Sequence, residues 1–429
     1  MTEKLLQFIW GFGYFSKAAL TTTNGEAVVV ILPGTLNKNG GPDFLNAKIR
    51  IGNTLFAGTV ELHLRTSDWR RHGHEADAAY RNVVLHVVFQ HDETVNAIPV
   101  LSLASRISLL LRQRYESFMN THASIACGSN ITSIKELTWN GWKERLLVER
   151  LSRKAKAVLQ LLDGSNRHWE ETFWWMLARA VGGKVNGDAF ETIAKSIPVN
   201  LLAKHKTSLH QLEALLLGQA GLLEDVFDDE YPKLLQREYR FLKSKYNLQP
   251  AVVKVQFLRM RPVAFPTVRL AQLAALLQQS THLFSKILEA ETLEEMTSMF
   301  NVTANDFWHY HYTLKQPAAF RKKTLGKDAI SNIIINTVAP VLFAYGLYHN
   351  TDGPKDKALR WLEEVDAEIN VITKEFAVLG VQAKTAYDSQ ALIELKNEYC
   401  LEKRCLECSV GNFVLREAAA DYKSRSGQQ

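Results

Sequence analysis

The chain has 429 residues, of which 46% are hydrophobic and 22% are charged, and its formal charge is +6. This length exceeds that of one compact core, so we expect two domains or one domain with a large extension. Four cysteines are too few for a secreted scaffold stapled by disulfides, and so small a charge excess does not by itself indicate a nucleic-acid-binding protein.

Two further features favour a cytoplasmic protein without membrane segments. The N-terminal sequence MTEKLLQFIWGFGYF has neither the apolar segment nor the cleavage site of a signal peptide. Residues 330–348 form the longest apolar stretch, but Asn336 and Pro340 interrupt it and it is short for a bilayer span. We predict a buried core helix there. The sequence does not predict an oligomeric state.

The first 105 residues predict an α/β module. A short apolar helix precedes three β-like stretches, and a polar connection, either a loop or a helix of weak helical character, leads to a fourth, nearly continuous apolar stretch. Side chains alternate most clearly in the third stretch, where Glu61 and His63 lie on a polar face opposite Leu62. The predicted order is therefore αβββαβ, with a helix at 3–15, strands at 27–32, 47–51, 57–65 and 82–90, and the connection at 70–80.

Beyond residue 105 the apolar spacing changes to that of amphipathic helices. We therefore predict an α+β protein, with an α/β module over residues 1–105 and a mainly helical region over 106–429 that ends in a cysteine cluster. The clearest predicted helices lie around Trp142 and at 169–181, 209–217, 231–245, 268–279, 293–299, 330–348 and 355–364.

Two acidic residues are the first candidates for chemistry. Asp43 follows a Gly-Gly-Pro turn at the approach to the second strand, and Glu61 lies on the polar face of the third. Acids from neighbouring strands can converge on one hard cation such as Mg²⁺ or Mn²⁺. Such an ion would activate a phosphodiester and the water that attacks it.

These residues resemble the PD-(D/E)xK nuclease superfamily, in which an Asp and a Glu hold the metal. The resemblance implies a restriction-endonuclease-like fold and a nucleic-acid substrate. His63 stands where the superfamily usually has a lysine. His63 can itself assist as a base or hydrogen-bond donor, or Lys48 or Arg65 can supply the missing cation. The alternative is a catalytically inactive protein that keeps the nuclease fold for binding or as a scaffold.

Longer sequence strings, which are spread over nearly the whole chain, carry a more specific resemblance than the nuclease motif does. They resemble the uncharacterised bacterial family named domain of unknown function 2851, which implies kinship but no activity. The strings are GGPDFLNAKI, GTVELHLRTSDWRRHGH, NVVLHVVF, WKERLLVERL, RPVAFPTVRLAQLA, NTVAPVLFAYG and YCLEKRCLECSVGNFVL.

Histidines in the same module support a competing metal site. Imidazole and carboxylate groups suit zinc or manganese, and His72 and His74 can share one ion. The alternative is a polar loop whose rings cap backbone carbonyls, with His86 as a satisfied core residue. The full set of candidates is His63, His72, His74 and His86, together with Asp68 and Asp77.

Three cysteines follow the pattern C-x4-C-x2-C at Cys400, Cys405 and Cys408, and the fourth is Cys127. Thiolates at this spacing suit zinc or an iron–sulfur cluster that staples the C-terminal segment to the helical body. The alternative is that they are free thiols used as small core residues.

A last pair of motifs would serve substrate binding. Arg259, Arg261 and Arg269 flank a proline-rich entry to a helix, where guanidinium groups and the helix N-terminus can bind phosphate or instead pin loop carbonyls. The aromatic residues of 307–312 can stack on bases, although aromatics at helical spacing more often belong to a core.

Overall fold

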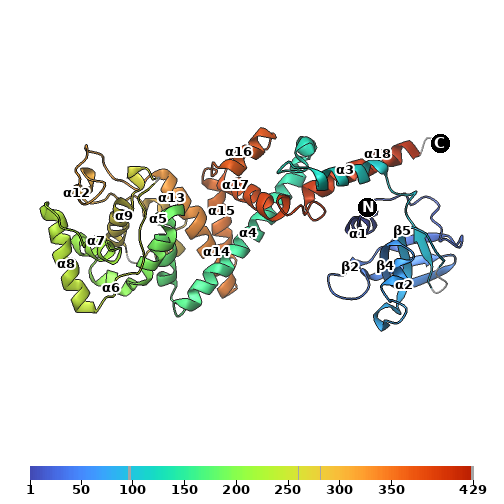
Figure 1. The fold of residues 1–429 in the computed structure, drawn as a ribbon, viewed down its shortest axis with the longest axis horizontal. Coiled ribbons are helices and arrows are strands. Elements are labelled where there is room, and N and C mark those ends of the chain that lie inside the picture. The colour runs from blue at the N-terminus through green and yellow to red at the C-terminus, as the bar shows by residue number, and fades with distance from the viewer. Residues whose placement is uncertain (95–97, 259, 281, 427–429) are drawn as a thin grey trace. The chain divides into compact units, whose positions relative to one another are not determined.

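The computed structural model describes residues 1–94, 98–258, 260–280 and 282–426, and Figure 1 shows its fold. Arg259, one of the predicted phosphate-binding arginines, lies outside the described residues. The chain divides into two compact units. The sheet unit comprises Met1–Glu144, Lys374–Gln382 and Ile393–Gln429, and the helical unit comprises Arg145–Thr373 and Ala383–Leu392.

The sheet unit contains the predicted strands in one mixed sheet. The spatial order is β1-β3-β4-β5-β6, with β2 paired to β3. The pairs among β1 to β4 are antiparallel, whereas β4, β5 and β6 run parallel. The sequence analysis did not predict β2 and β6, which are very short. The strands are β1 (Val28–Leu32), β2 (Thr35–Leu36), β3 (Phe44–Ile51), β4 (Thr54–Arg65), β5 (Val83–Gln90) and β6 (Val100–Ser102).

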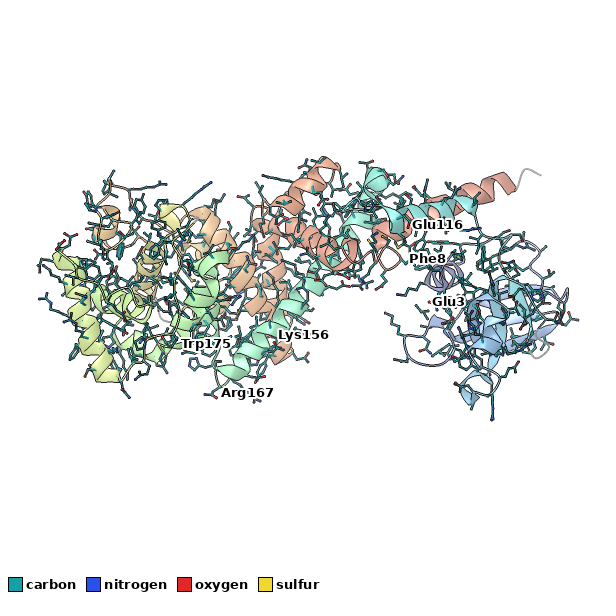
Figure 2. The ribbon with its side chains drawn as sticks, in the orientation of Figure 1. Glu3, Phe8, Glu116, Lys156, Arg167 and Trp175 are labelled. Atoms are coloured by element: carbon teal, nitrogen blue, oxygen red, sulfur yellow. The ribbon has the colours of Figure 1, made fainter. Side chains whose placement is uncertain are left out.

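Helix α1 (Glu3–Phe12) packs its apolar stripe on the sheet, close to β4 (Figure 1). The Thr2 hydroxyl accepts a hydrogen bond from the Leu5 N–H at the start of the helix, and Gly13 ends it in the left-handed conformation. Leu5, Leu6, Phe8, Ile9 and Trp10 are buried. Glu3 and Phe8 are labelled on this helix in Figure 2.

The polar connection between β4 and β5, predicted as a helix or a loop over 70–80, consists mainly of turns. It contains one turn of helix, α2 (Asp68–Arg71), and a 3₁₀ turn, η1 (Ala78–Tyr80). Asp68 and Asp77 serve local structure, since Asp68 accepts the Arg65 N–H and Asp77 accepts the Ala79 N–H. Both acids therefore have local hydrogen-bonding roles that do not depend on binding a metal together with the nearby histidines.

The rest of the sheet unit is helical. Helix α3 (Leu109–Asn120) lies beside α18 (Ser409–Ser426), as Figure 1 shows. Two hydrogen bonds tie these distant parts of the chain together: the Ser108 hydroxyl donates to the Ala418 carbonyl over 3.1 Å, and Arg114 donates to the Val414 carbonyl over 3.0 Å. The short helix η2 (Gly128–Ser133) also contacts α18.

The helical unit confirms a mostly helical remainder of the chain. Helix α5 bends where Gly183 adopts a φ of 65°, and Trp175 of this helix is labelled in Figure 2. Besides part of α4 (Glu136–Gly164), its longer helices are α5 (Trp169–Lys195), α7 (Leu209–Gln219), α8 (Glu230–Tyr246), α9 (Pro266–Gln279), α14 (Ala339–His349) and α15 (Gly353–Glu364). The shorter ones are α6 (Val199–Lys204), α10 (Leu283–Glu289), α11 (Leu293–Ser298), α12 (Asp306–His309), α13 (Lys327–Ile333) and α17 (Ala386–Glu394). Helix α16 (Val371–Val378) lies at the division between the units.

Within the described residues, one continuous helical stretch, Lys327–His349, has the length and composition of a membrane span. It joins α13 to α14 through the π-helical segment η4 (Ile334–Val338). Most of this stretch is buried inside the structure, and the neighbouring helices include α5 and α15. This packing is that of the core helix predicted for residues 330–348.

Candidate metal centre

Three histidines bring their ring nitrogens together at one end of β4. His63 is on β4, and His72 and His74 follow α2 in the connection to β5. One nitrogen from each ring lies within 4.8 Å of the others. His72 Nδ1 is 3.1 Å from His63 Nε2. His63 is 2% exposed, whereas His72 is open to solvent.

A carboxylate joins two of these rings. Glu61 Oε1 lies 3.5 Å from His63 Nε2 and 3.5 Å from His74 Nε2. Glu61 and His63 are two residues apart on β4, so the period of the strand places both side chains on the same face. The sequence analysis predicted this shared face. It is not an open polar surface, however, because Glu61 is 5% exposed beneath the connection between β4 and β5.

Asp43 and Glu61 meet through the backbone of the neighbouring strand. The Asp43 N–H donates to Glu61 Oε2 over 3.0 Å, and the Leu62 N–H donates to Asp43 Oδ2 over 3.1 Å. The other Asp43 oxygen accepts a 2.8 Å hydrogen bond from the Gln7 side chain of α1. Both Asp43 oxygens therefore have a donor, while Glu61 Oε1 faces the histidines.

Burial controls the ionisation of these groups. Desolvation raises the pKa of Glu61 to about 8, and the Asp43 charge adds to that shift. Desolvation also raises the pKa of Asp43 to about 6, against the lowering effect of the Leu62 hydrogen bond. It lowers the pKa of His63 to about 3, helped by the neighbouring histidines. His63 is thus a neutral imidazole at physiological pH, the form that binds metals.

His86 contacts the second ring nitrogen of His63, Nδ1. Its Nε2 is 2.9 Å from His63 Nδ1, and its ring is fully buried on β5. A hydrogen bond to the far nitrogen is how proteins usually orient a metal-binding imidazole. Tyr80 stacks on the His74 ring at 3.8 Å between centroids. His86 is therefore a core residue, as predicted, but one that contacts the candidate centre.

The geometry fits a nitrogen-rich divalent site. Zinc with bonds of 2.0–2.1 Å to imidazole nitrogen has tetrahedral ligands spaced by about 3.3 Å. The 3.1 Å separation of the His63 and His72 nitrogens is close to that spacing, and the third ring nitrogen lies within 4.8 Å of both. The buried His74 Nε2 has no hydrogen-bond partner among the described residues, which is the state expected of a nitrogen whose partner is an ion.

Lys48 and Arg65 lie on the same face of the sheet as Glu61 but at a distance. Lys48 pairs with Ala57 in β4, which lies four residues before Glu61, and Arg65 lies four residues after it. Four residues of strand span about 13 Å. The fold therefore does not bring either cation beside the two acids, although both are exposed on that face.

The other predicted binding residues lie in the helical unit. Arg269 is partly buried in α9 and donates to Gln272 over 3.0 Å, and its desolvation lowers its pKa. Arg261 precedes the 3₁₀ turn η3 (Pro262–Ala264). In the aromatic patch, Trp308 is fully buried, as expected of a core residue, whereas Tyr310 is exposed.

Three residues near the centre were not predicted from the sequence. Gln7 holds Asp43, Tyr80 covers His74, and Glu3 raises the pKa of both Asp43 and Glu61 through its charge. Glu3 and Gln7 are one helical turn apart on α1, so they share a side of that helix. The spacing of Glu3 and Gln7 could have shown from the sequence that they share a side of the helix, but it does not reveal which strand the helix covers.

Comparison with known proteins gives one match. A family model described as "Protein of unknown function (DUF2851)" matches residues 3–371, a range that includes every histidine and acid of the centre. No curated protein and no solved structure matches the chain. The predicted likeness to the PD-(D/E)xK nucleases therefore stays a prediction, and Cys400, Cys405 and Cys408 lie beyond the matched residues.

Proposed function

Because the chain belongs to the DUF2851 family, whose description names no activity, we propose a function from the candidate centre. We propose that the chain is a divalent-metal-dependent hydrolase of nucleic acid phosphodiester bonds and that His63, His72 and His74 hold the metal. The convergence of three ring nitrogens beside the Glu61 carboxylate is the observation that carries this proposal.

The ligand set favours zinc or manganese over magnesium. Imidazole suits zinc and other transition metals, whereas magnesium prefers carboxylate oxygen and water. Three protein ligands leave a coordination position open for chemistry, as catalytic zinc sites do. When bound, such an ion supplies Lewis-acid activation of a phosphoryl oxygen and of water.

The protein's own groups supply the proton transfer. Glu61 Oε1 lies beside two of the ring nitrogens, within reach of a water molecule that shares the site. Its second oxygen is held by the Asp43 N–H, which fixes the orientation of the carboxylate. A bound cation would lower the raised pKa of Glu61, so that its carboxylate could take the proton of the attacking water while Asp43 and Gln7 position it.

Exposed cations around the site favour an anionic substrate. Arg70 and Arg71 are both largely exposed. They are the last two residues of α2, and His72 follows them directly. Lys48 and Arg50 are exposed on the same face of the sheet as Glu61. A phosphodiester chain that crosses this face would meet cations on either side of the histidines.

A binding or scaffold function is the second candidate. Glu61 and His63 are buried, so a substrate reaches the centre through the side of His72. A metal held there without an open position would stabilise the connection between β4 and β5 and catalyse nothing.

One pair of assays separates these functions. We expect Zn²⁺ or Mn²⁺ to raise the melting temperature of the purified chain, by an amount worth about 2.7 kcal/mol at one hundred times Kd. His74→Ala should lose that shift and the cleavage of labelled DNA or RNA. His122→Ala, which changes an exposed histidine of the same unit, should keep both.

The outcomes are distinct. Metal binding that depends on His74 without cleavage would support the scaffold function. A shift with Mg²⁺ that is lost in Asp43→Ala but kept in His74→Ala would instead support the predicted site at Asp43 and Glu61. Cleavage that survives both His63→Ala and His74→Ala would refute the proposed centre.

A further inference from the structure

We propose that Cys127, Cys400, Cys405 and Cys408 together bind one iron–sulfur cluster in the sheet unit. This site is independent of the histidine centre and of the proposed function. All four thiols are free, and all four belong to the same compact unit although Cys127 is far from the others in sequence. Cys127, Cys405 and Cys408 are buried, and Cys400 is partly buried.

Secondary structure brings the four residues to one place. Cys127 immediately precedes η2, and Cys408 immediately precedes α18, which contacts η2. Cys400 ends the π-helical segment η5 (Leu395–Cys400), in which Tyr399 packs edge-on against Trp142 at 5.1 Å between ring centroids. The Trp142 indole also lies close enough to the Cys408 sulfur to lower the pKa of that thiol. Cys408 and Tyr399, the residue before Cys400, therefore both lie beside Trp142.

The backbone between the cysteines turns tightly around the sulfurs. Lys403 adopts a φ of 49° between Cys400 and Cys405, and the Arg404 N–H donates to the Tyr399 carbonyl over 2.9 Å. At Gly411 a side chain would collide with the Cys405 carbonyl, so glycine permits this close approach.

Backbone donors also surround one sulfur. The N–H groups of Val410 and Gly411, at the start of α18, lie close enough to the Cys408 sulfur to lower the pKa of that thiol. Such N–H donors to sulfur are typical of cluster-binding loops, where they adjust the reduction potential.

The electrostatics would be unfavourable for four thiolates without a cation. Burial raises the pKa of Cys127 to about 12, and the charges of Cys408 and Cys405 raise it further. Burial likewise raises the pKa of Cys400, and the charges of Cys408, Cys127 and Cys405 add to that shift. Cys127 and Cys400 thus both interact with Cys405 and Cys408. Positively charged iron reverses this balance by holding the thiols deprotonated.

The spacing of the sulfurs selects a cluster over a single ion. A tetrahedral zinc site with Zn–S bonds of 2.3 Å requires sulfurs about 3.8 Å apart. No three of the four sulfurs, all of them in the described part of the chain, lie within 4.8 Å of one another. In an iron–sulfur cluster each iron binds one or two of the four thiolates, so no three of the sulfurs have to surround one metal ion.

Metal analysis of the full chain tests this assignment. Protein purified without oxygen, or reconstituted anaerobically with ferrous iron and sulfide, should contain iron and acid-labile sulfide in equal amounts and absorb broadly near 400 nm. We expect Cys405→Ser and Cys408→Ser to lose at least nine-tenths of the iron, and His74→Ala to keep it. Cys400→Ser is the milder variant, since Cys400 is the least buried of the four.

The possible results separate clearly. Zinc in place of iron, lost in the same variants, would overturn the cluster in favour of a single ion. Four thiols that remain reactive after anaerobic reconstitution, with neither metal bound, would overturn the site altogether. If the serine variants do not fold, the iron and sulfide content of the unaltered chain decides the question by itself. Because His74→Ala retains the iron, failure of the histidine centre and failure of this site are distinguishable.

Discussion

Glu213 in the helical unit should make the stability of that unit fall as pH rises. The carboxyl is fully buried in α7, and its Oε2 accepts hydrogen bonds from the Tyr231 hydroxyl over 2.8 Å and from the Trp308 indole over 2.9 Å. Its Oε1 has no partner among the described residues. No cation among the described residues compensates for the buried charge, so the protonated acid is favoured.

The magnitude follows from the pKa of this group. Desolvation raises the pKa of Glu213 from 4.5 to about 7, although the Trp308 and Tyr231 hydrogen bonds oppose it. At about 1.4 kcal/mol for each pH unit, ionisation in the folded state costs roughly 3 kcal/mol. Below pH 4.5 both states hold the proton and nothing is lost. Between pH 4.5 and 7 the unfolded chain loses its proton first, so rising pH favours unfolding.

Glu213→Gln removes the titration and keeps the shape of the side chain. Its amide oxygen can still accept from Tyr231 and Trp308. Relative to the unaltered chain, the variant should gain about 2.5 kcal/mol of unfolding free energy between pH 5 and pH 8. Urea unfolding at several pH values, followed by tryptophan fluorescence, measures this difference. Glu289→Gln, which removes an exposed carboxyl of the same unit, is the matched control.

The result that would refute this reasoning is a free-energy difference between Glu213→Gln and the unaltered chain that stays constant over the pH range. It would mean that water or a rearranged donor reaches Oε1 and that the carboxylate is solvated in the folded state.

Two further predictions concern contacts of helices in the helical unit, and the first has its control position, Gly141, in the part of α4 that belongs to the sheet unit. In Gly218→Ala the new methyl group collides with the Tyr239 ring, so thermal unfolding should show a loss of about 1–3 kcal/mol in unfolding free energy. Gly141→Ala, at an exposed helical site without neighbours, should instead raise the unfolding free energy by up to about 1 kcal/mol. Equal effects of the two changes would contradict the packing of α7 on α8. Glu170→Ala removes the carboxylate that accepts the N–H groups of Phe284 and Ser285, and a loss of about 1–3 kcal/mol is expected by denaturant unfolding, with no loss counting against the cap.

The regular elements were largely predictable because their side-chain periods are local. The long apolar run of β5 and the helical spacing of α7, α8 and α9 were assigned to the correct element types. The short strand β6 was missed because three residues carry too little pattern. The connection between β4 and β5 could be predicted only as a helix or a loop, because its turns are set by caps such as Asp77 and not by a side-chain period.

Part of the candidate centre was also predictable. Strand alternation alone places Glu61 and His63 on one face, and the hydrogen bonds between Asp43, Glu61 and Leu62 agree with acids on neighbouring strands. The sequence could not reveal that this face is buried. That depends on how the residues after α2 fold back over β4, which brings His72 and His74 to His63.

The cysteines show the same limit of sequence-based prediction, because Cys127 is far from the other three in the sequence. The spacing of Cys400, Cys405 and Cys408 is local, so it predicts a loop that can point several sulfurs toward one place. The position of Cys127 depends on contacts between α3, η2 and α18, which join segments from opposite ends of the chain. Ordering so distant a pair costs loop-closure entropy that the apolar contacts of α18 must offset. A cluster bound by all four thiols would offset it further, because it cross-links the two segments in the folded state alone. Loss of the cluster should therefore loosen α18 from α3 before it disturbs the sheet.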